Sequence, residues 1–474
     1  MKLHVSVAVL SGVDGSVLWT TPASERLKFI DCGLGYTGGG KGTVCILVGV
    51  SRMLKAVNSS SGSSFWETKN VYPSHRIPAA LPVQLPDIDG DGFGDMLLGS
   101  RPATLANRIR DVSFVFVSGA TGALIGQPVT YNVTGEGKLI GPKACVSGEG
   151  ALYILFGYGS IQAVSVRDIY KQANGKGSLP PSLWKEDPTL EWKREGNLSG
   201  LLEVYSGNSS ARDLQVLSGT GGNFSDLLIT TKNKLQLLRG KLLRQVWQAV
   251  GSSIEGVPVP GFFNEDRVLD FLIQVTSGNS TRKSLIIDGS SGKELWQAEL
   301  GCRSQGSEAA SIPLSDGRSA FLFWAGECGA EPLTLRTDSD RDNGYHLFLL
   351  HPSYPHVLLK LATSLGPVTA SARTYFYSDA VPSGPRHSHY WKHPLHIHSI
   401  QAFQNSVGFN EIPPPPVKIY EPFSSGSHRR HTRSARQLIR PCHPFPAGVI
   451  GWDLGPEFLL HYPRCVEVPQ PDQE

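Results

Sequence analysis

The feature that most constrains how this chain folds is an aspartate-rich loop at residues 87–95, which reads DIDGDGFGD and runs directly into the apolar segment MLL. Its carboxylates stand at loop positions 1, 3, 5 and 9 and belong to Asp87, Asp89, Asp91 and Asp95. Carboxylate oxygens at this spacing favour calcium, the carbonyl of Phe93 supplies a further oxygen, and Gly92 allows the tight turn. Position 12 is Leu98 rather than the bidentate Glu of an EF-hand. The loop therefore predicts a calcium site that leads into a β-strand.

The same loop has a second interpretation. Asp and Gly favour turns in any case, so an Asp/Gly-rich turn that binds nothing has the same composition. Four carboxylates within nine residues repel one another without a cation, and this charge argument favours calcium. The candidate metal-binding residues are Asp87, Asp89, Asp91, Phe93 and Asp95.

Composition favours a turn-rich β-protein and gives no footprint of nucleic-acid binding. The chain has 474 residues with 52 Gly and 33 Pro, which suits either several ordinary domains or one large repeat architecture. The formal net charge is +3 and only 18% of residues are charged, so there is no basic surface for a nucleic acid. No apolar stretch approaches the roughly 18 residues that a membrane helix needs.

Six Asn-x-Ser/Thr triplets predict a lumenal or extracellular location. The acceptors, all in turn-like surroundings, are Asn58, Asn132, Asn197, Asn208, Asn223 and Asn279. The opening segment MKLHVSVAVLSG is too short and too strand-like for a signal peptide. Together these features predict a piece of a longer, anchored protein.

The seven cysteines include no Cys-x-x-Cys pair, which disfavours a zinc ribbon or a thioredoxin-type site. Cys32 and Cys45 flank a glycine-rich loop between two apolar runs, so a hairpin would place them close enough for a disulfide. Cys302 and Cys328 are a second candidate pair, and buried free thiols remain the alternative. The remaining cysteines are Cys145, Cys442 and Cys465.

A weak internal repeat consists of an apolar strand, a turn of small residues with Gly, and a second strand that often ends in Trp. Spacings of about 50–60 residues are typical of the four-stranded blades of a propeller. The copies are residues 7–19, 53–66, 114–126, 235–247 and 284–296, with degenerate copies at 161–170 and 346–361. Trp19, Trp66, Trp247 and Trp296 are expected to pack between blades as large apolar side chains, while stacking on a cofactor, as in quinoproteins, is the less favoured role.

The calcium-type loop recurs in decayed form. Residues 261–273 keep Asn264, Asp266 and Asp270 but have Phe262 where the first aspartate belongs, and residues 219–229 keep only Asp226. We therefore expect the same local shape at each position but a full ligand set at only one.

Other motifs in the sequence lack the surrounding residues or secondary structure that their usual function requires. Residues 33–38 match G-x-G-x-x-G and the stretch up to Lys41 approaches a Walker A loop, but a strand rather than a helix follows. A glycine-rich hairpin is the favoured interpretation. The His-rich stretch 387–398 and the basic run 427–436 are expected to be solvated surface rather than a zinc or copper site or a cleavage site. No motif of a serine hydrolase or zinc protease occurs, so no catalytic residue is predicted.

Several segments, taken in order, resemble a known family: SGVDGSVLW, CILVG, LPDIDGDGFGDMLL, LYILFG, SAFLFW and LFLLHPSYPHVLLKL. The set is similar to the FG-GAP-type repeat proteins called family with sequence similarity 234, most like member A, over roughly residues 5–370. The resemblance implies a type II single-pass membrane protein with a glycosylated, propeller-like ectodomain and no established activity. It also implies a cytoplasmic segment, a signal-anchor helix and a first calcium-type repeat, and against the family's pattern we expect this chain to begin after all three.

Together these features predict an all-β, seven-bladed propeller-like domain with FG-GAP or quinoprotein-type repeats over residues 1–371, and an irregular Pro/His/Ser-rich tail over 372–474. The first functional hypothesis is a non-catalytic cell-surface glycoprotein that binds a protein partner through propeller loops. The alternatives are a quinoprotein-like enzyme, supported only by fold analogy, and a calcium-stabilised scaffold. Membrane attachment is expected only through an N-terminal anchor outside this chain.

Overall fold

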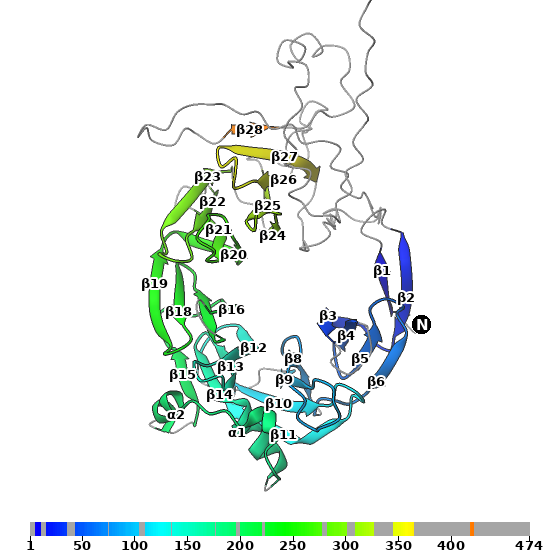
Figure 1. Ribbon diagram of the computed structural model, residues 1–474. Coiled ribbons are helices and arrows are strands. Elements are labelled where there is room, and N and C mark those ends of the chain that lie inside the picture. The colour runs from blue at the N-terminus through cyan, green and yellow to red at the C-terminus, as the bar shows by residue number, and fades with distance from the viewer. Residues whose placement is uncertain are drawn as a thin grey trace, which may run out of the picture. The chain divides into compact units, whose positions relative to one another are not determined.

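The computed structural model (Figure 1) describes residues 5–10, 16–35, 43–73, 75–103, 110–133, 135–175, 177–195, 200–219, 223–276, 282–300, 309–326, 345–364 and 418–420. Its chain divides into two compact units, residues 1–254 and 255–474. Both units are built from small sheets in which strands that follow one another in sequence pair antiparallel. This architecture is all-β and propeller-like, as the sequence predicts.

The first unit contains a two-stranded sheet and four larger sheets. The two-stranded sheet is β1 (Val5–Leu10) with β2 (Val17–Ala23), and the next is β3 (Leu27–Gly35), β4 (Thr43–Gly49), β5 (Leu54–Asn58) and β6 (Ser64–Thr68). The third sheet holds β7 (Arg76–Pro78), β8 (Val83–Gln84), β9 (Met96–Pro102), β10 (Asp111–Val117) and β11 (Leu124–Asn132). The fourth holds β12 (Leu139–Val146), β13 (Leu152–Tyr158), β14 (Ile161–Ser165) and β15 (Leu202–Tyr205), and the fifth β16 (Asp213–Ser218), β17 (Ser225–Thr230), β18 (Lys234–Arg239) and β19 (Arg244–Val250).

The second unit begins within β20 (Ser253–Gly261) and contains two sheets. β20 is followed by β21 (Asp270–Thr276), β22 (Arg282–Ile287) and β23 (Glu294–Glu299). The other sheet holds β24 (Ala309–Pro313), β25 (Ser319–Gly326), β26 (Tyr345–Leu350) and β27 (Val357–Ser364), and β28 (Lys418–Tyr420) pairs parallel with β27.

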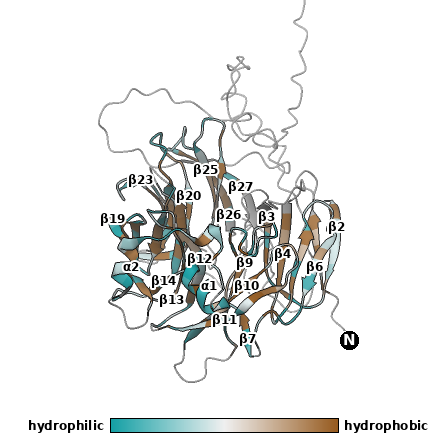
Figure 2. Cartoon of the chain, turned by 60° about the horizontal axis from the view of Figure 1, so that its bottom comes forward, coloured by the Kyte–Doolittle hydropathy of each residue, from teal (hydrophilic) through white to brown (hydrophobic). Residues whose placement is uncertain are grey.

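The pattern of apolar residues explains the order of strands within a sheet. Middle strands such as β10 are nearly continuous apolar runs, buried on both faces, and Figure 2 shows them in brown. Fourth strands such as β6 alternate instead, so Trp66 points inward while its neighbours in sequence are exposed. The predicted strand-turn-strand copies are confirmed as hairpins at β5–β6, β10–β11, β18–β19, β22–β23 and β26–β27.

One predicted copy, residues 161–170, is wrong beyond residue 165. An insert with α1 (Val166–Asn174), a short 3-10 helix (Pro181–Leu183) and α2 (Pro188–Glu195) lies between β14 and β15. The Ser165 hydroxyl caps α1 by accepting the Asp168 N–H at 3.0 Å. Val166, Ile169 and Ala173 bury one face of the helix, which is the helical spacing that the strand interpretation overlooked.

Three of the four predicted Trp side chains join neighbouring sheets. Trp19, Trp66 and Trp296 are buried, and each indole N–H donates to a carbonyl in a hairpin turn of the next sheet in sequence. These turns are β5–β6, β10–β11 and β26–β27. The acceptors are Ser59, Gly119 and Pro355, at 2.8, 2.8 and 2.7 Å respectively. The rings lie so close to these turns that a Cβ added at Gly122 would fall 2.5 Å from the Trp66 ring.

Cys32 and Cys45 are joined by a disulfide across β3 and β4, with Cα atoms 4.0 Å apart. Cys145 is a buried free thiol, and burial raises its pKa to about 12. The candidate pair Cys302 and Cys328, together with Cys442 and Cys465, lies outside the described residues. Among the described residues, no helix has the length and apolar character needed to cross a membrane.

Replacing Trp66 by Phe is expected to destabilise the protein by at least about 1–3 kcal/mol, because the Gly119 carbonyl loses its buried donor and the smaller ring loses part of the indole packing. Urea unfolding followed by circular dichroism measures this change. Trp192→Phe is the matched control, since Trp192 is 75% exposed and its replacement should change stability little. Equal effects of the two substitutions would contradict the role assigned to the indole bond.

Candidate functional site

The aspartate-rich loop connects β8 to β9, and Asp95 stands directly before β9. Asp87, Asp89 and Asp95 each direct one carboxylate oxygen into a group whose members all lie within 4.8 Å of one another. Such an oxygen-only set suits a hard divalent cation, and calcium in particular accepts several carboxylates in a flexible geometry. The structure thus brings together three of the four predicted aspartates.

Asp91 lies outside this group. One of its carboxylate oxygens accepts the Ser118 hydroxyl at 3.1 Å, and the other accepts the Phe93 N–H at 2.8 Å. The side chain therefore ties the loop to the turn after β10. Its role as a ligand, like that of the Phe93 carbonyl, stays a prediction.

Asp95 has a structural role that the sequence analysis did not assign to it. Its carboxylate is fully buried and accepts the N–H groups of Ile88 at 2.7 Å and Gly119 at 3.0 Å. Burial raises the pKa of this carboxyl and the nearby charge of Asp89 adds to the effect, while the N–H bonds oppose it. Asp95 thus fastens the start of β9 to the turn after β10.

The same aspartate clamp occurs in two other sheets. Asp226 accepts the Gly240 N–H at 3.0 Å, and Asp270 accepts the Gly289 N–H at 3.1 Å and the Phe263 N–H at 2.8 Å. Only glycine fits opposite the aspartate. A Cβ added at Gly289 would lie 1.8 Å from the Leu269 carbonyl oxygen, and Gly119 and Gly240 are equally close to the residue before their aspartate. An aspartate at loop position 9 is therefore no sign of a metal by itself.

The loop before β21 shows what shape the chain adopts without the first carboxylate. Asp266 and Val268 donate their N–H groups to the side chains of Asn264 and Asp266, as Asp91 and Phe93 do to Asp89 and Asp91 in the full loop. The turn thus forms from its own hydrogen bonds. What distinguishes the full loop is Asp87, which accepts the N–H groups of Gly90 and Gly92, and the charge of Asp89.

The other predicted sites fall on different parts of the surface. Asn132, Asn208 and Asn223 are exposed, whereas Asn58 is half-buried and its side-chain oxygen accepts the Ser60 N–H at 2.8 Å. Asn197, Asn279, Lys41 and the His-rich and basic stretches lie outside the described residues. The strands that flank the glycine-rich loop, β3 and β4, pair antiparallel, which confirms a hairpin rather than the strand-helix unit of a nucleotide site.

Asp270 is expected to make stability depend on pH. Burial raises the pKa of its carboxyl to about 6, so between pH 4 and 6 the native state binds more protons than the unfolded state. This group's contribution to the unfolding free energy should therefore fall as pH rises, by up to about 3 kcal/mol. Denaturant titrations between pH 4 and 7 measure the unfolding free energy. The decrease due to Asp270 should be present in the wild type and absent in Asp270→Asn. Asp266→Asn, at an exposed position, should keep most of this decrease, because the charge of Asp266 is only the smallest of the causes that act on the pKa of Asp270. An identical pH profile for wild type and Asp270→Asn would refute the assignment.

Comparison with known proteins agrees with this architecture. Residues 4–378 match the family described as FAM234A/B beta-propeller. The chain is 40% identical over 370 residues to protein FAM234B of Gallus gallus, which covers 78% of this chain and 58% of the relative. FAM234B of Homo sapiens is 40% identical over 368 residues, covering 77% of this chain and 58% of the relative.

FAM234A of Homo sapiens is 30% identical over 359 residues, covering 75% of this chain and 61% of the relative. Identity is thus higher to these FAM234B proteins than to this FAM234A protein, so the expected likeness to member A is corrected to the family as a whole. The chain spans less than two thirds of the length of these relatives. The match over residues 4–378 and the identity to these relatives establish that the chain belongs to the FAM234A/B β-propeller family.

Proposed function

We propose that this chain is part of the ectodomain of a non-catalytic, glycosylated cell-surface protein whose propeller binds another protein. The observation that carries the proposal is the helical insert between β14 and β15, which exposes two large aromatic side chains. Trp184 is 65% exposed and Trp192 75% exposed. Exposed Trp is costly to leave in water and is enriched among the residues that dominate protein interfaces.

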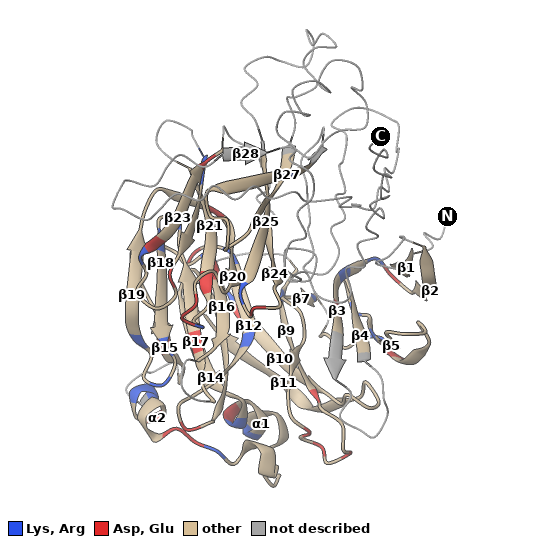
Figure 3. Cartoon of the chain, turned by 45° about the horizontal axis from the view of Figure 1, so that its top comes forward, with Lys and Arg blue, Asp and Glu red and all other residues tan. Residues whose placement is uncertain are grey.

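The insert is held firmly enough to present these rings in a fixed arrangement. Glu191 of α2 accepts the buried Tyr153 hydroxyl at 2.6 Å and the Arg194 side chain at 2.8 Å. Arg194 also reaches Asp168 of α1 at 3.6 Å, which links the two helices. Leu183 of the 3-10 helix and Leu190 of α2 are buried. Figure 3 shows charged residues of both signs along the insert. A partner therefore meets a preorganised surface, which lowers the entropy cost of binding.

Catalysis has weaker support. The names of the matched relatives state no reaction. In quinoproteins a Trp can stack on the cofactor, but Trp19, Trp66 and Trp296 are occupied here in packing against the next sheet and bonding to its carbonyls. A quinoprotein-like enzyme therefore remains only an analogy of fold.

We further propose that the full loop binds one calcium ion through Asp87, Asp89 and Asp95, with Asp91 and the Phe93 carbonyl completing the set. The converging carboxylates support this proposal. In the alternative scaffold hypothesis calcium binds at the same site and only stabilises the fold, and the protein binds no partner. The proposal includes type II membrane attachment through an anchor outside this chain. It also includes glycosylation at three exposed acceptors, Asn132, Asn208 and Asn223.

Calcium at about 1 mM should raise the melting temperature of the purified chain relative to a chelator, because the ion binds only the folded loop. Asp87→Asn combined with Asp89→Asn should abolish the rise, whereas Asp266→Asn in the loop before β21 should preserve it. Differential scanning calorimetry measures these shifts. Asp95 is left intact because its loss would also break the clamp. A wild-type melting temperature that is the same with calcium and with chelator would exclude the site.

Changing Trp184 and Trp192 together to Ala should remove the partner without unfolding the chain, since both side chains are mostly in water. Proximity labelling of the anchored full-length protein on living cells, read by mass spectrometry, should lose a specific set of labelled proteins in this variant. Phe65→Ala, at a 48% exposed aromatic on β6, is the matched control and should retain them. Unchanged labelling in the double variant would reject the insert as the binding surface.

A further inference from the structure

A group of cationic side chains lies around the end of the third sheet opposite the aspartate-rich loop. The loop precedes the start of β9, whereas Arg101 lies near the end of β9 and Arg110 stands just before β10. Lys28 is near the start of β3 and Tyr158 is the last residue of β13. All of these residues belong to the first unit.

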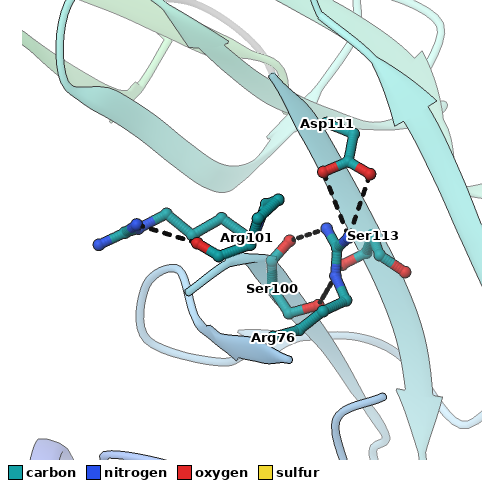
Figure 4. Close-up of polar contacts among 6 residues, drawn as sticks. Arg76, Ser100, Arg101, Asp111 and Ser113 are labelled. Carbon is teal, nitrogen blue, oxygen red and sulfur yellow. Dashed lines mark hydrogen bonds and ion pairs between the residues drawn. The ribbon is translucent and has the colours of Figure 1, made fainter. Parts of the chain in front are cut away.

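One carboxylate close to this group, that of Asp111, is already paired. Asp111 forms an ion pair with Arg76 at 3.1 Å, and Arg76 also donates to the Ser100 hydroxyl and carbonyl at 3.0 and 2.8 Å. Figure 4 shows Arg76 directed at Asp111 while the Arg101 side chain extends away from it. Arg76 is therefore a structural residue with its donors satisfied.

The other three cations each have a neutral acceptor and no ion pair within the described part of the chain. Lys28 donates to the Pro78 carbonyl at 2.5 Å, Arg101 to the Pro102 carbonyl at 3.2 Å, and Arg110 to the Gly135 carbonyl. An ammonium has three N–H donors and a guanidinium five, so most of their donors remain available.

The backbone brings two of these cations near each other, because Arg101 pairs with Ile77 and the Lys28 ammonium donates to the carbonyl of the next residue, Pro78. Burial lowers the pKa of Lys28 and the positive charge of Arg101 lowers it further. Burial raises the pKa of Tyr158, and Arg101, Arg110 and Arg76 act against that shift while Asp111 adds to it. Like charges gathered in this way are unfavourable unless an anion lies among them.

A buried hydroxyl also lacks a partner here. Tyr158 is only 2% exposed, and within the described residues its phenol oxygen makes no hydrogen bond. The Arg110 guanidinium lies 5.4 Å from the centroid of the same ring. Buried hydroxyls are normally hydrogen-bonded, so this one is suited to donate to a bound ligand.

A polar cleft continues from this point. Gly135, whose carbonyl accepts from Arg110, and Gly159, which follows Tyr158, line it, and its volume is about 340 Å³. The other lining residues are polar or glycine and include one carboxylate: Glu136, Ser160, Ser206, Gly207, Asn208 and Ser210. Backbone groups and hydroxyls of this kind can receive the neutral, hydroxyl-rich part of a ligand whose anionic group meets the cations.

We propose that Lys28, Arg101, Arg110 and the Tyr158 hydroxyl form a binding site for a tetrahedral oxyanion, a sulfate or phosphate group. Guanidinium and ammonium donors are the groups that recognise such anions in proteins. The site requires no calcium and no protein partner, so its test is independent of the function proposed above.

Isothermal titration calorimetry of the whole chain with sodium sulfate tests the site, in a buffer with chelator and with chloride at fixed ionic strength. Saturable binding is expected, and Arg101→Gln should weaken it about tenfold or more, as the loss of one charge-assisted contact implies. Arg244→Gln removes the same charge from the exposed start of β19 and should leave the affinity unchanged. No saturable heat with wild type, or equal weakening by both substitutions, would overturn the proposal.

Tyr158→Phe provides a second test that does not depend on charge. It removes a hydroxyl that makes no bond within the described chain, so sulfate affinity should fall by a few-fold while the melting temperature without sulfate stays near that of wild type. Unchanged sulfate affinity in this variant would show that the hydroxyl takes no part. A further arm replaces sulfate by phosphate and by a sulfated disaccharide. Tighter binding of the disaccharide would identify a sugar-borne group as the source, and equal affinities would identify the free ion.

Discussion

Burying a carboxylate inside a β-sheet costs several kcal/mol unless backbone donors surround it, and this requirement organises the sheets of the protein. Asp95, Asp226 and Asp270 are all buried at the point where a middle strand begins. Each is satisfied by the N–H of a glycine in the turn that follows the next strand, at 3.0–3.1 Å. The turn can approach that closely only because the glycine has no Cβ. In each of these sheets the Asp–Gly pair therefore adds to the backbone ladder a contact that favours one register of the two middle strands.

The Trp contacts extend this order from one sheet to the next. The turn that Asp95 fastens through the Gly119 N–H is the same turn whose Gly119 carbonyl accepts the Trp66 indole. Gly119 thus donates its N–H to an aspartate of its own sheet and accepts, at its carbonyl, the indole N–H from the preceding sheet. Loss of the aspartate would move the acceptor of the Trp, so we expect the two interactions to be coupled rather than additive.

Local patterns explain which parts of this structure the sequence could predict. Hairpins such as β22–β23 follow from apolar runs around a glycine turn, and the docking of Trp66 follows from an aromatic residue at the end of an alternating strand. The sequence analysis did not predict the boundary between β14 and α1. The spacing of the apolar residues changes there from every second residue to helical spacing of 3.6 residues, at Ser165 within one apolar stretch. The second role of Asp95 was missed because its partner lies 24 residues away, beyond the reach of a local motif. The cationic group of Lys28, Arg101 and Arg110 is dispersed over three sequence segments, so only folding reveals it.

The two roles of the aspartate-rich loop also explain the decay of its other copies. Loop position 9 keeps its aspartate in both decayed copies, because that aspartate holds the sheet together. Asp270 remains although position 1 is Phe262, and Asp226 remains although the loop before it is shorter. At position 3 a charge is not needed for the shape of the loop, because the loop before β21 keeps its hydrogen bonds with Asn264 in place of an aspartate. At position 1, Asp87 both accepts the Gly90 and Gly92 N–H groups and adds a charge, so the full loop carries a repulsion between Asp87 and Asp89 that the decayed loop avoids. A cation at this end of the third sheet and an anion at its other end would each relieve an excess of like charge that the sheet itself leaves uncompensated.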